Sequence, residues 1–309
     1  MKIADVRTVL QMSLHLPMLS FALLTAALAP GPVTTAGASG VPNPGGEEAS
    51  AMPAYESVEF NVQVRDRTIA VKMLSPPQDK LARDPALLLG FAGERDTALL
   101  AYPHNQPARY FLAHGHRVAS FDMPHEGARV GPFGWGITGC RNAFVAGLDP
   151  FAMFVEEGRA GIDHCVKRGW ARPGRIAVAG TSRGGYMALR LLAADARVAA
   201  GAGFASVTDW RDLSEFAADR ARKDVAALRL TRFVDGMVGK HVYLAIGGHD
   251  ARVSTASCRR LARALLRANV KAGYDASRVD FHLTDDPDHT MGDASYLQGR
   301  EFLLSCVTP

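Results

Sequence analysis

The sequence has few features that would tie it to a cofactor, a metal or a nucleic acid. It contains no Rossmann fingerprint, P-loop or cofactor-lysine motif, so we expect no cofactor. Only four cysteines are present, at positions 140, 165, 258 and 306, and no two have metal-ligand spacing, which argues against a zinc site. The net charge is only +4 and is spread along the chain, so we expect no nucleic-acid partner.

The first residues have the composition of a targeting segment. Positive charges at Lys2 and Arg7 precede a mostly apolar stretch over residues 14–29, and residues 36–38 (Ala-Gly-Ala) fit a small-residue cleavage site. We therefore expect a signal peptide over residues 1–38 and a secreted or periplasmic protein.

Alternatives to this cleavage remain open. A second candidate site at residues 27–29 is weakened by the Pro30 that follows it. An uncleaved membrane anchor is disfavoured because the apolar stretch is short and contains Pro17, so we expect no stable membrane span after cleavage. Residues 39–53 are rich in Gly, Pro and Ala and predict a flexible linker. In an exported chain the cysteines can oxidise, but the sequence does not select a pairing.

Residues 54–309 have the size of one large α/β domain. Two β-rich runs predict an antiparallel strand pair, and strand-like and helix-like stretches alternate after it. This alternation predicts a mostly parallel sheet with helices on both faces. The expected strands are 57–64, 68–74, 86–91, 117–121, 175–179, 198–204, 241–246 and 278–284; the expected helices are 106–113, 151–168, 185–192, 254–272 and 294–306, with a long loop up to residue 147.

Residues 180–184, Gly-Thr-Ser-Arg-Gly, form the motif on which the functional prediction depends. An apolar run over 175–179 predicts a buried strand before it, and residues 185–192 are rich in helix formers. A strand, a tight glycine turn and a helix are the context that makes Gly-x-Ser-x-Gly a nucleophile elbow. We therefore expect Ser182 to be a nucleophile. An ordinary glycine-rich turn with a solvated serine is the alternative.

A serine nucleophile needs a base and a carboxylate that orients the base. In a parallel sheet these groups are expected at the carboxyl ends of strands. Asp250 follows the strand expected at 241–246, and His289 follows the strand expected at 278–284. Each lies in a loop before a helix, so we expect Asp250 and His289 to be the partners of Ser182.

Other residues compete for these roles. Asp250 also suits a helix N-cap, and His249 and His282 are rival bases. Three aspartates close to His289 in sequence, at positions 285, 286 and 288, lack the reach to orient its ring. Histidines at positions 104, 114, 116 and 125 suggest a metal cluster, but they spread over separate elements, and we interpret them as surface or pocket-lining residues.

With these motifs the mature chain resembles an α/β-hydrolase over nearly its whole length. It is most similar to the branch that holds dienelactone hydrolases, acetyl esterases and prolyl-oligopeptidase-type catalytic domains. The resemblance implies Ser182 as nucleophile, His289 as base and Asp250 as orienting acid, in the chain order typical of this fold. The segments that carry it are the elbow at 180–185, the acid loop Gly-His-Asp-Ala-Arg-Val at 248–253, the His289 loop with a helix ending at 300–304, and residues 121–129, which resemble an Asp-x-Pro-x-x-Gly loop.

Acyl transfer also needs two donors for the oxyanion. One is expected to be the backbone N–H of Arg183, directly after the nucleophile. The other is expected from the loop after the 86–91 strand, as the N–H of either Phe91 or Ala92. This loop departs from the His-Gly pair common in the family, and it argues against the lipase type with a Gly-Gly-Gly oxyanion hole.

Two segments are candidates for the walls of the pocket. The insertion at 208–239 is expected to be a small helical lid or pocket wall, with a solvated surface helix pair as the alternative; its large apolar residues are Trp210, Phe216, Phe233 and Met237. The loop at 124–147 offers apolar surface through Phe133, Trp135 and Ile137. Arg129 and Arg183 either hold an acidic or sugar-linked acyl group or make structural ion pairs.

The expected function is that of a secreted serine hydrolase, foremost a carboxylic ester hydrolase that works through an acyl-enzyme. We expect a small-molecule or carbohydrate-linked ester as substrate. The lack of a propeller domain before the hydrolase domain favours an esterase over the alternative of a prolyl-oligopeptidase-like serine peptidase or an acyltransferase. A third alternative is an inactive binding module with this fold, which the unusual oxyanion loop favours.

Overall fold

The computed structural model describes residues 52–308. The expected signal peptide lies outside the described residues, as does nearly all of the expected linker. Within the described part, no helix is long and apolar enough to cross a membrane.

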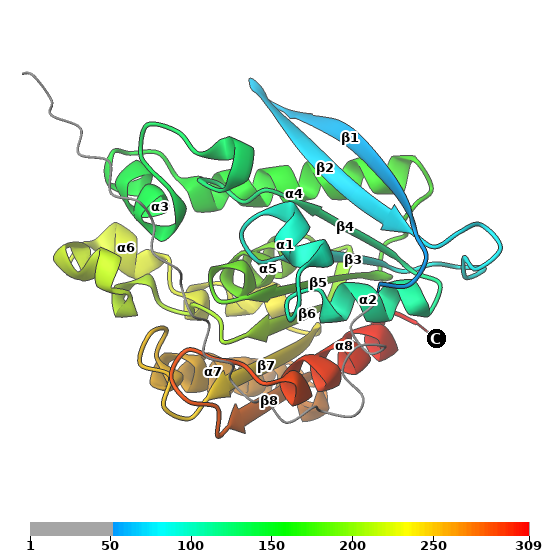
Figure 1. Cartoon of the computed structure of the whole chain (residues 1–309). Helices are drawn as coiled ribbons and strands as arrows, with labels where there is room; N and C mark the ends of the chain where they lie inside the picture. Colours follow the sequence, from blue (N-terminus) through cyan, green and yellow to red (C-terminus); the bar gives the residue numbers. More distant parts are fainter. Residues whose placement is uncertain (1–51, 309) are drawn as a thin grey trace, which may run out of the picture. The chain divides into compact units, whose positions relative to one another are not determined.

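In residues 52–308, eight strands form one sheet in the order β1-β2-β4-β3-β5-β6-β7-β8 (Figure 1). The strands are β1 (Glu56–Val64), β2 (Arg67–Ser75), β3 (Leu87–Phe91), β4 (Arg117–Phe121), β5 (Ile176–Thr181), β6 (Val198–Phe204), β7 (His241–Gly247) and β8 (Val279–Thr284). Strand β2 pairs antiparallel with β1 and β4, and every other pairing is parallel. The prediction of a mostly parallel sheet after an initial hairpin is confirmed.

Helices cover both faces of the sheet, as the alternating sequence predicted. Helices α4, α5 and α7 pack on one face around Phe154 and Leu189, and α2 and α8 pack on the other around Phe111 and Tyr296. The helices are α1 (Arg95–Leu100), α2 (Gln106–Ala113), α3 (Gly136–Val145), α4 (Pro150–Lys167), α5 (Arg183–Ala194), α6 (Lys223–Ala227), α7 (Thr255–Lys271) and α8 (Asp293–Val307).

Two helices were not expected. Helix α1 has only six residues, too short for a periodic pattern to be read. Helix α3 lies where a long loop was predicted, and that prediction is wrong. Its glycines, Gly136 and Gly139, are poor helix formers, but Ile137, Cys140 and Phe144 follow a helical spacing that could have indicated it.

The insertion at 208–239 is not a helix pair, and it is solvated only in part. It contains the short helix α6 and the 3-10 turns η2 (Trp210–Asp212), η3 (Ser214–Asp219), η4 (Leu230–Arg232) and η5 (Val234–Met237). Trp210, Phe216 and Met237 are fully buried in the main hydrophobic core. The alternative of a solvated helix pair therefore does not hold, because apolar residues of this segment complete the core. The expected lid is not confirmed; the segment lines the pocket beside Ser182 through Glu215.

Candidate active site

Ser182 lies between strand β5 and helix α5, in the strand–turn–helix context that its motif predicted. Its φ is 55°, a backbone conformation that side chains rarely adopt outside tight turns. A Cβ on Gly180 would collide with the backbone of Gly184, and a Cβ on Gly184 would collide with the carbonyl of Phe91. The glycines thus allow β5, α5 and the end of β3 to approach one another closely around the serine.

The structure brings Ser182, His289 and Asp250 together from the carboxyl ends of β5, β8 and β7. His289 Nε2 lies 2.9 Å from Ser182 Oγ, and His289 Nδ1 lies 2.8 Å from Asp250 Oδ2. A carboxylate at Nδ1 holds the imidazole in the tautomer whose Nε2 accepts a proton from the serine hydroxyl. The arrangement can therefore move a proton away from Ser182.

Asp250 is held in place by its own loop. It is 3% exposed, and its Oδ1 accepts a hydrogen bond from the backbone N–H of Val253 at 3.0 Å. One carboxylate oxygen thus fixes the loop before α7 while the other contacts His289. The alternative of a helix N-cap does not hold, because Ser254 is the N-cap of α7.

The rival histidines lie elsewhere. His282 pairs with Asp280 on the same strand at 2.7 Å, and His249 is exposed. Among the four histidines considered as a metal cluster, His104 contacts Thr181 Oγ1 at 3.2 Å, whereas His116 accepts from the N–H of Ala86. Residues 52–308 contain no group of histidines, cysteines and carboxylates that would hold a metal ion.

The expected oxyanion donors lie at the junction of β3 and the elbow. Arg183 is the first residue of α5, directly after Ser182. Phe91 ends β3, and its side chain is buried in the core, whereas Ala92 borders the pocket that contains Ser182. Of the two alternatives left open by the sequence, Ala92 is the one that lines this pocket.

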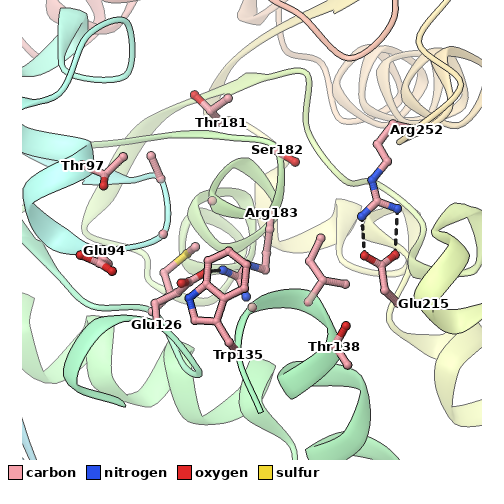
Figure 2. A pocket seen from close by; sticks show the side chains of 16 residues that line it. Glu94, Thr97, Glu126, Trp135, Thr138, Thr181, Ser182, Arg183, Glu215 and Arg252 are labelled. Carbon is pink, nitrogen blue, oxygen red and sulfur yellow. Dashed lines mark hydrogen bonds and ion pairs between the residues drawn. The ribbon is translucent and has the colours of Figure 1, made fainter. Parts of the chain in front are cut away.

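A pocket of about 420 Å³ opens beside Ser182 (Figure 2). Trp135 and Ile137 line it, as expected from the loop at 124–147, but Phe133 is not among its lining residues. The insertion at 208–239 contributes Glu215. The other side chains that Figure 2 labels around the pocket are Glu94, Thr97, Glu126, Thr138, Thr181, Arg183 and Arg252.

The pocket arginines are engaged in ion pairs. Arg183 pairs with Glu126, and both side chains are more than nine-tenths buried; burial lowers the pKa of Arg183 to about 10. At the rim, Arg252 holds Glu215 through two hydrogen bonds of 2.6 and 2.8 Å (Figure 2). Glu94 is exposed in the pocket wall. The sequence offered no signal for the partnership of Glu215, which is 37 residues from Arg252.

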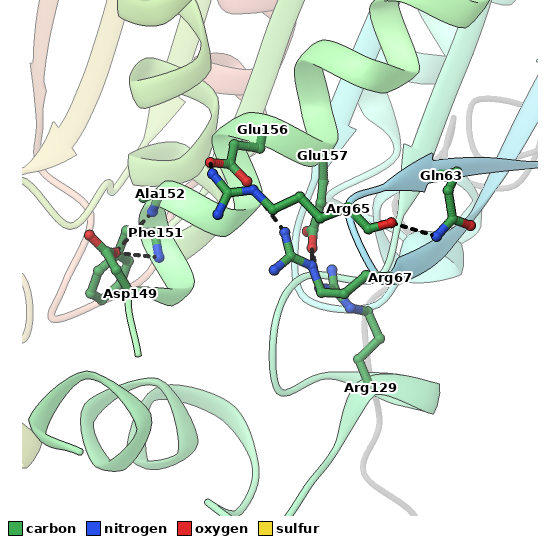
Figure 3. A network of polar contacts seen from close by, with 9 residues as sticks. All are labelled: Gln63, Arg65, Arg67, Arg129, Asp149, Phe151, Ala152, Glu156 and Glu157. Atoms are coloured by element: carbon green, nitrogen blue, oxygen red, sulfur yellow. Dashed lines mark hydrogen bonds and ion pairs between the residues drawn. The ribbon is translucent and has the colours of Figure 1, made fainter. Parts of the chain in front are cut away.

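A buried glutamate positions the loop that carries Glu126. Glu157 on α4 is fully buried. Its Oε1 forms ion pairs with Arg129 Nη2 at 2.8 Å and with Arg67 Nε at 3.2 Å (Figure 3). Burial raises the pKa of Glu157, and the two guanidinium groups oppose that rise. Arg129 also donates to the carbonyl of Asp122 at 2.7 Å. Arg129 and Arg183 thus make the structural ion pairs that were one of the two expectations for them.

Comparison with known proteins supports the resemblance seen in the motifs. Residues 155–304 match the family model described as "Prolyl oligopeptidase family". A search of curated protein sequences found no match.

Solved structures with a similar fold include both peptidases and an esterase. Acylaminoacyl peptidase from Pyrococcus horikoshii matches with a TM-score of 0.60 at 13% identity, over 82% of this chain and 41% of that chain. Dipeptidyl peptidase 4 from Porphyromonas gingivalis matches with a TM-score of 0.62 at 18% identity, over 84% and 37%. A cold-adapted esterase from an Arctic intertidal metagenomic library matches with a TM-score of 0.61 at 19% identity, over 82% and 95%.

This chain spans less than half the length of the two peptidase chains and nearly the whole length of the esterase chain. At these identities the likeness to solved structures shows the fold. It confirms the expected α/β-hydrolase fold, and the match over residues 155–304 supports a hydrolase similar to prolyl-oligopeptidase-type catalytic domains.

Proposed function

We propose that the protein is a serine hydrolase that cleaves carboxylic esters through an acyl-enzyme on Ser182. The observation that carries this proposal is the continuous hydrogen-bond chain from Asp250 through His289 to Ser182 Oγ. A small-molecule or carbohydrate-linked ester is the proposed substrate, since the pocket of about 420 Å³ presents both apolar and charged side chains.

In the proposed reaction, His289 Nε2 takes the hydroxyl proton as Ser182 Oγ attacks the ester carbonyl carbon. The tetrahedral intermediate collapses, and the leaving alcohol receives the proton from His289. Water then attacks the acyl-enzyme with His289 again as the base, and the carboxylic acid departs as Ser182 recovers its proton. Asp250 holds the imidazole in the required tautomer and stabilises the imidazolium that forms in each half-reaction.

The oxyanion of each tetrahedral intermediate needs preorganised donors. We assign this role to the backbone N–H groups of Arg183 and Ala92. The helix dipole at the N-terminus of α5 favours the developing negative charge at the same position. The buried ion pair with Glu126 holds the side chain of Arg183 in the pocket wall.

A fluorophosphonate probe tests the proposed nucleophile. Such a probe reacts with an activated serine and forms a bond to Oγ, so the expected result is labelling of Ser182 in the wild-type protein and none in Ser182→Ala. Labelling must also disappear after heat denaturation, because activation depends on the folded arrangement. A folded wild-type protein that does not react would favour an inactive binding module with this fold.

A serine peptidase is the second candidate. The family match over residues 155–304 favours it. Ser182, His289 and Asp250 could cleave a peptide amide by the same acyl-enzyme route. Matched p-nitrophenyl esters and p-nitroanilides with the same acyl group separate the two functions. An esterase is expected to hydrolyse the ester at a far higher kcat/KM than the anilide and to leave peptide amides intact.

We also propose that the protein is exported. The support is the signal pattern over residues 1–38, with cleavage before Ser39. N-terminal sequencing of protein recovered from the periplasm or the medium is expected to begin at Ser39. Recovery of the uncut chain from the cytoplasm alone would contradict export without affecting the proposed chemistry.

A further inference from the structure

A second pocket, of about 230 Å³, lies between the turns η2 and η4 and helix α7. We name it the Thr208 pocket. It shares no lining residue with the pocket beside Ser182. Its lining residues are Thr208, Asp209, Arg211, Arg229, Thr231, Ser257 and Arg260.

Three arginines line the Thr208 pocket, and they are engaged to different degrees. Arg211 is held by Asp209, with Nε 2.9 Å from Oδ1. Arg260 donates to the hydroxyl of Ser257, which in turn donates to Asp212. Within residues 52–308, the guanidinium of Arg229 makes neither a hydrogen bond nor an ion pair, although it lies close enough to Asp209 to lower the pKa of that carboxyl together with Arg211. The guanidinium groups thus outnumber the nearby carboxylates, Asp209 and Asp212.

Thr208 supplies an independent indication of a ligand. The residue is only 3% exposed, and its Oγ1 is buried with no hydrogen-bond partner in the described part of the chain. Buried polar atoms in folded proteins are almost always paired, so the unpaired hydroxyl of this pocket-lining residue calls for a partner. The backbone around it is well anchored, since the carbonyl of Thr208 accepts from the N–H of Leu230 at 2.9 Å.

We propose that the Thr208 pocket binds a tetrahedral oxyanion, phosphate or sulfate, either free or as a monoester. The guanidinium groups of Arg229 and Arg260 donate charge-assisted hydrogen bonds to its oxygens, and Thr208 Oγ1 donates a further one. The donors come from three segments that line the pocket, just before η2, just before η4 and on α7, which suits a tetrahedral group better than a planar carboxylate. The pocket volume of about 230 Å³ leaves room for a small organic group on a monoester.

Titration of the full chain with inorganic phosphate, followed by ³¹P line broadening and by thermal unfolding, tests the proposal. The ionic strength is kept constant with chloride, so that general screening does not contribute. We expect saturable binding and a rise in Tm that chloride does not produce. Sulfate is expected to compete, phenyl phosphate shows whether the pocket accepts a monoester, and acetate is expected to bind at least tenfold more weakly.

Two variants locate the binding. Arg229→Gln is expected to weaken phosphate binding about tenfold or more, because it removes charge-assisted hydrogen bonds. Thr208→Val keeps the volume and removes the unpaired hydroxyl, so it is expected to fold at least as stably as the wild type without phosphate and yet to bind phosphate more weakly. The matched control is Arg222→Gln, which removes an arginine of the same insertion that pairs with Asp224 outside the pocket.

Absence of saturable phosphate or sulfate binding to the wild-type protein would overturn the proposal. Equal weakening by Arg229→Gln and Arg222→Gln would also overturn it, since the effect would then be one of net charge. Neither result bears on the chemistry proposed at Ser182, because the two pockets have no residue in common.

Discussion

At the scale of single residues, the candidate site is formed by three side chains that follow the carboxyl ends of β5, β7 and β8. His289 lies 107 residues after Ser182 and 39 residues after Asp250 in the sequence. Its ring nonetheless contacts both side chains, Ser182 Oγ through Nε2 and the Asp250 carboxylate through Nδ1. The sequence predicted these three because each follows a strand and a parallel sheet brings strand ends together. It could not predict that Glu126 and Glu215 would neutralise Arg183 and Arg252, since ion pairs between loops follow no spacing rule.

The first prediction at this scale concerns the orienting acid. Asp250→Asn replaces the carboxylate with an amide that does not hold His289 in the required tautomer, so kcat for a p-nitrophenyl ester is expected to fall by about three to four orders of magnitude. KM is expected to change little, because Asp250 does not border the substrate pocket. The control is Asp285→Asn, an exposed aspartate near His289 in sequence. Equal losses in the two variants would contradict the assigned role.

A second prediction concerns pH and a histidine away from the site. Burial lowers the pKa of His116 to about 4 from its ordinary 6.5, with smaller effects of Arg175 and His114, and its Nδ1 accepts the N–H of Ala86 at 3.2 Å. The folded state binds fewer protons here than the unfolded state, so the stability contributed by neutral His116 is present above pH 6.5 and is lost as the pH falls toward 4.

The variant His116→Asn keeps an acceptor near the Nδ1 position but does not titrate. The loss of unfolding free energy between pH 6.5 and 4 is expected to be smaller in this variant than in the wild type by about 2 kcal/mol. Urea unfolding at several pH values measures the difference. Parallel stability profiles for the two proteins would show that His116 does not titrate as the burial argument requires.

At the scale of elements, most strands and long helices could be predicted because their apolar residues repeat with the period of the element. The helices α2 and α4 and the strands β4 and β6 follow the expected ranges within about one residue. Helix α3 was missed because its glycines obscured its apolar spacing. For the 208–239 segment, the sequence suggested that Trp210 and Phe216 form a lid or pocket wall, whereas they are buried in the core. Apolar residues in an insertion do not reveal from the sequence which surface they pack against.

The elbow is the element most sensitive to an added methyl group. Gly184→Ala would place a Cβ against the carbonyl of Phe91, which cannot move without shifting strand β3 and the loop that holds Ala92. We expect a loss of about 3 kcal/mol in the free energy of unfolding, and a lower kcat in the protein that still folds. Urea denaturation and ester hydrolysis measure the two effects.

The control for this variant is Gly161→Ala inside α4. A Cβ at Gly161 meets nothing within 4 Å, so alanine there is expected to stabilise the helix by about 0.5 to 1 kcal/mol. The two substitutions are chemically identical and are expected to act in opposite directions. A destabilisation of similar size at both positions would contradict the close packing inferred for the elbow.

At the scale of the whole molecule, two hydrophobic clusters on the faces of one sheet hold the fold without covalent cross-links in the described residues. The cysteines Cys140, Cys165, Cys258 and Cys306 are all free, and the first three are buried. The sequence left the disulfide pairing open, and the structure contains no disulfide among these four cysteines. Burial raises the pKa of the three buried thiols to about 12, which keeps them as unreactive thiols at neutral pH.

The resulting prediction is that a reducing agent leaves the stability unchanged. A native disulfide contributes about 2 to 4 kcal/mol, so its reduction would lower Tm by several degrees. We expect equal Tm values with and without a phosphine reductant, and four titratable thiols in the unfolded protein. Of these, Cys306 is expected to react first in the native state, because it is the least buried. A fall in Tm on reduction would contradict the absence of disulfides.

The central claim is that Ser182 is a nucleophile activated by His289 and Asp250. The most direct test is hydrolysis of p-nitrophenyl acetate and butyrate by the purified protein beside Ser182→Ala, with circular dichroism to show that both are folded. Turnover by the wild type and a loss of at least about a thousandfold in the variant is the predicted result. Turnover that is unchanged by Ser182→Ala would contradict the claim.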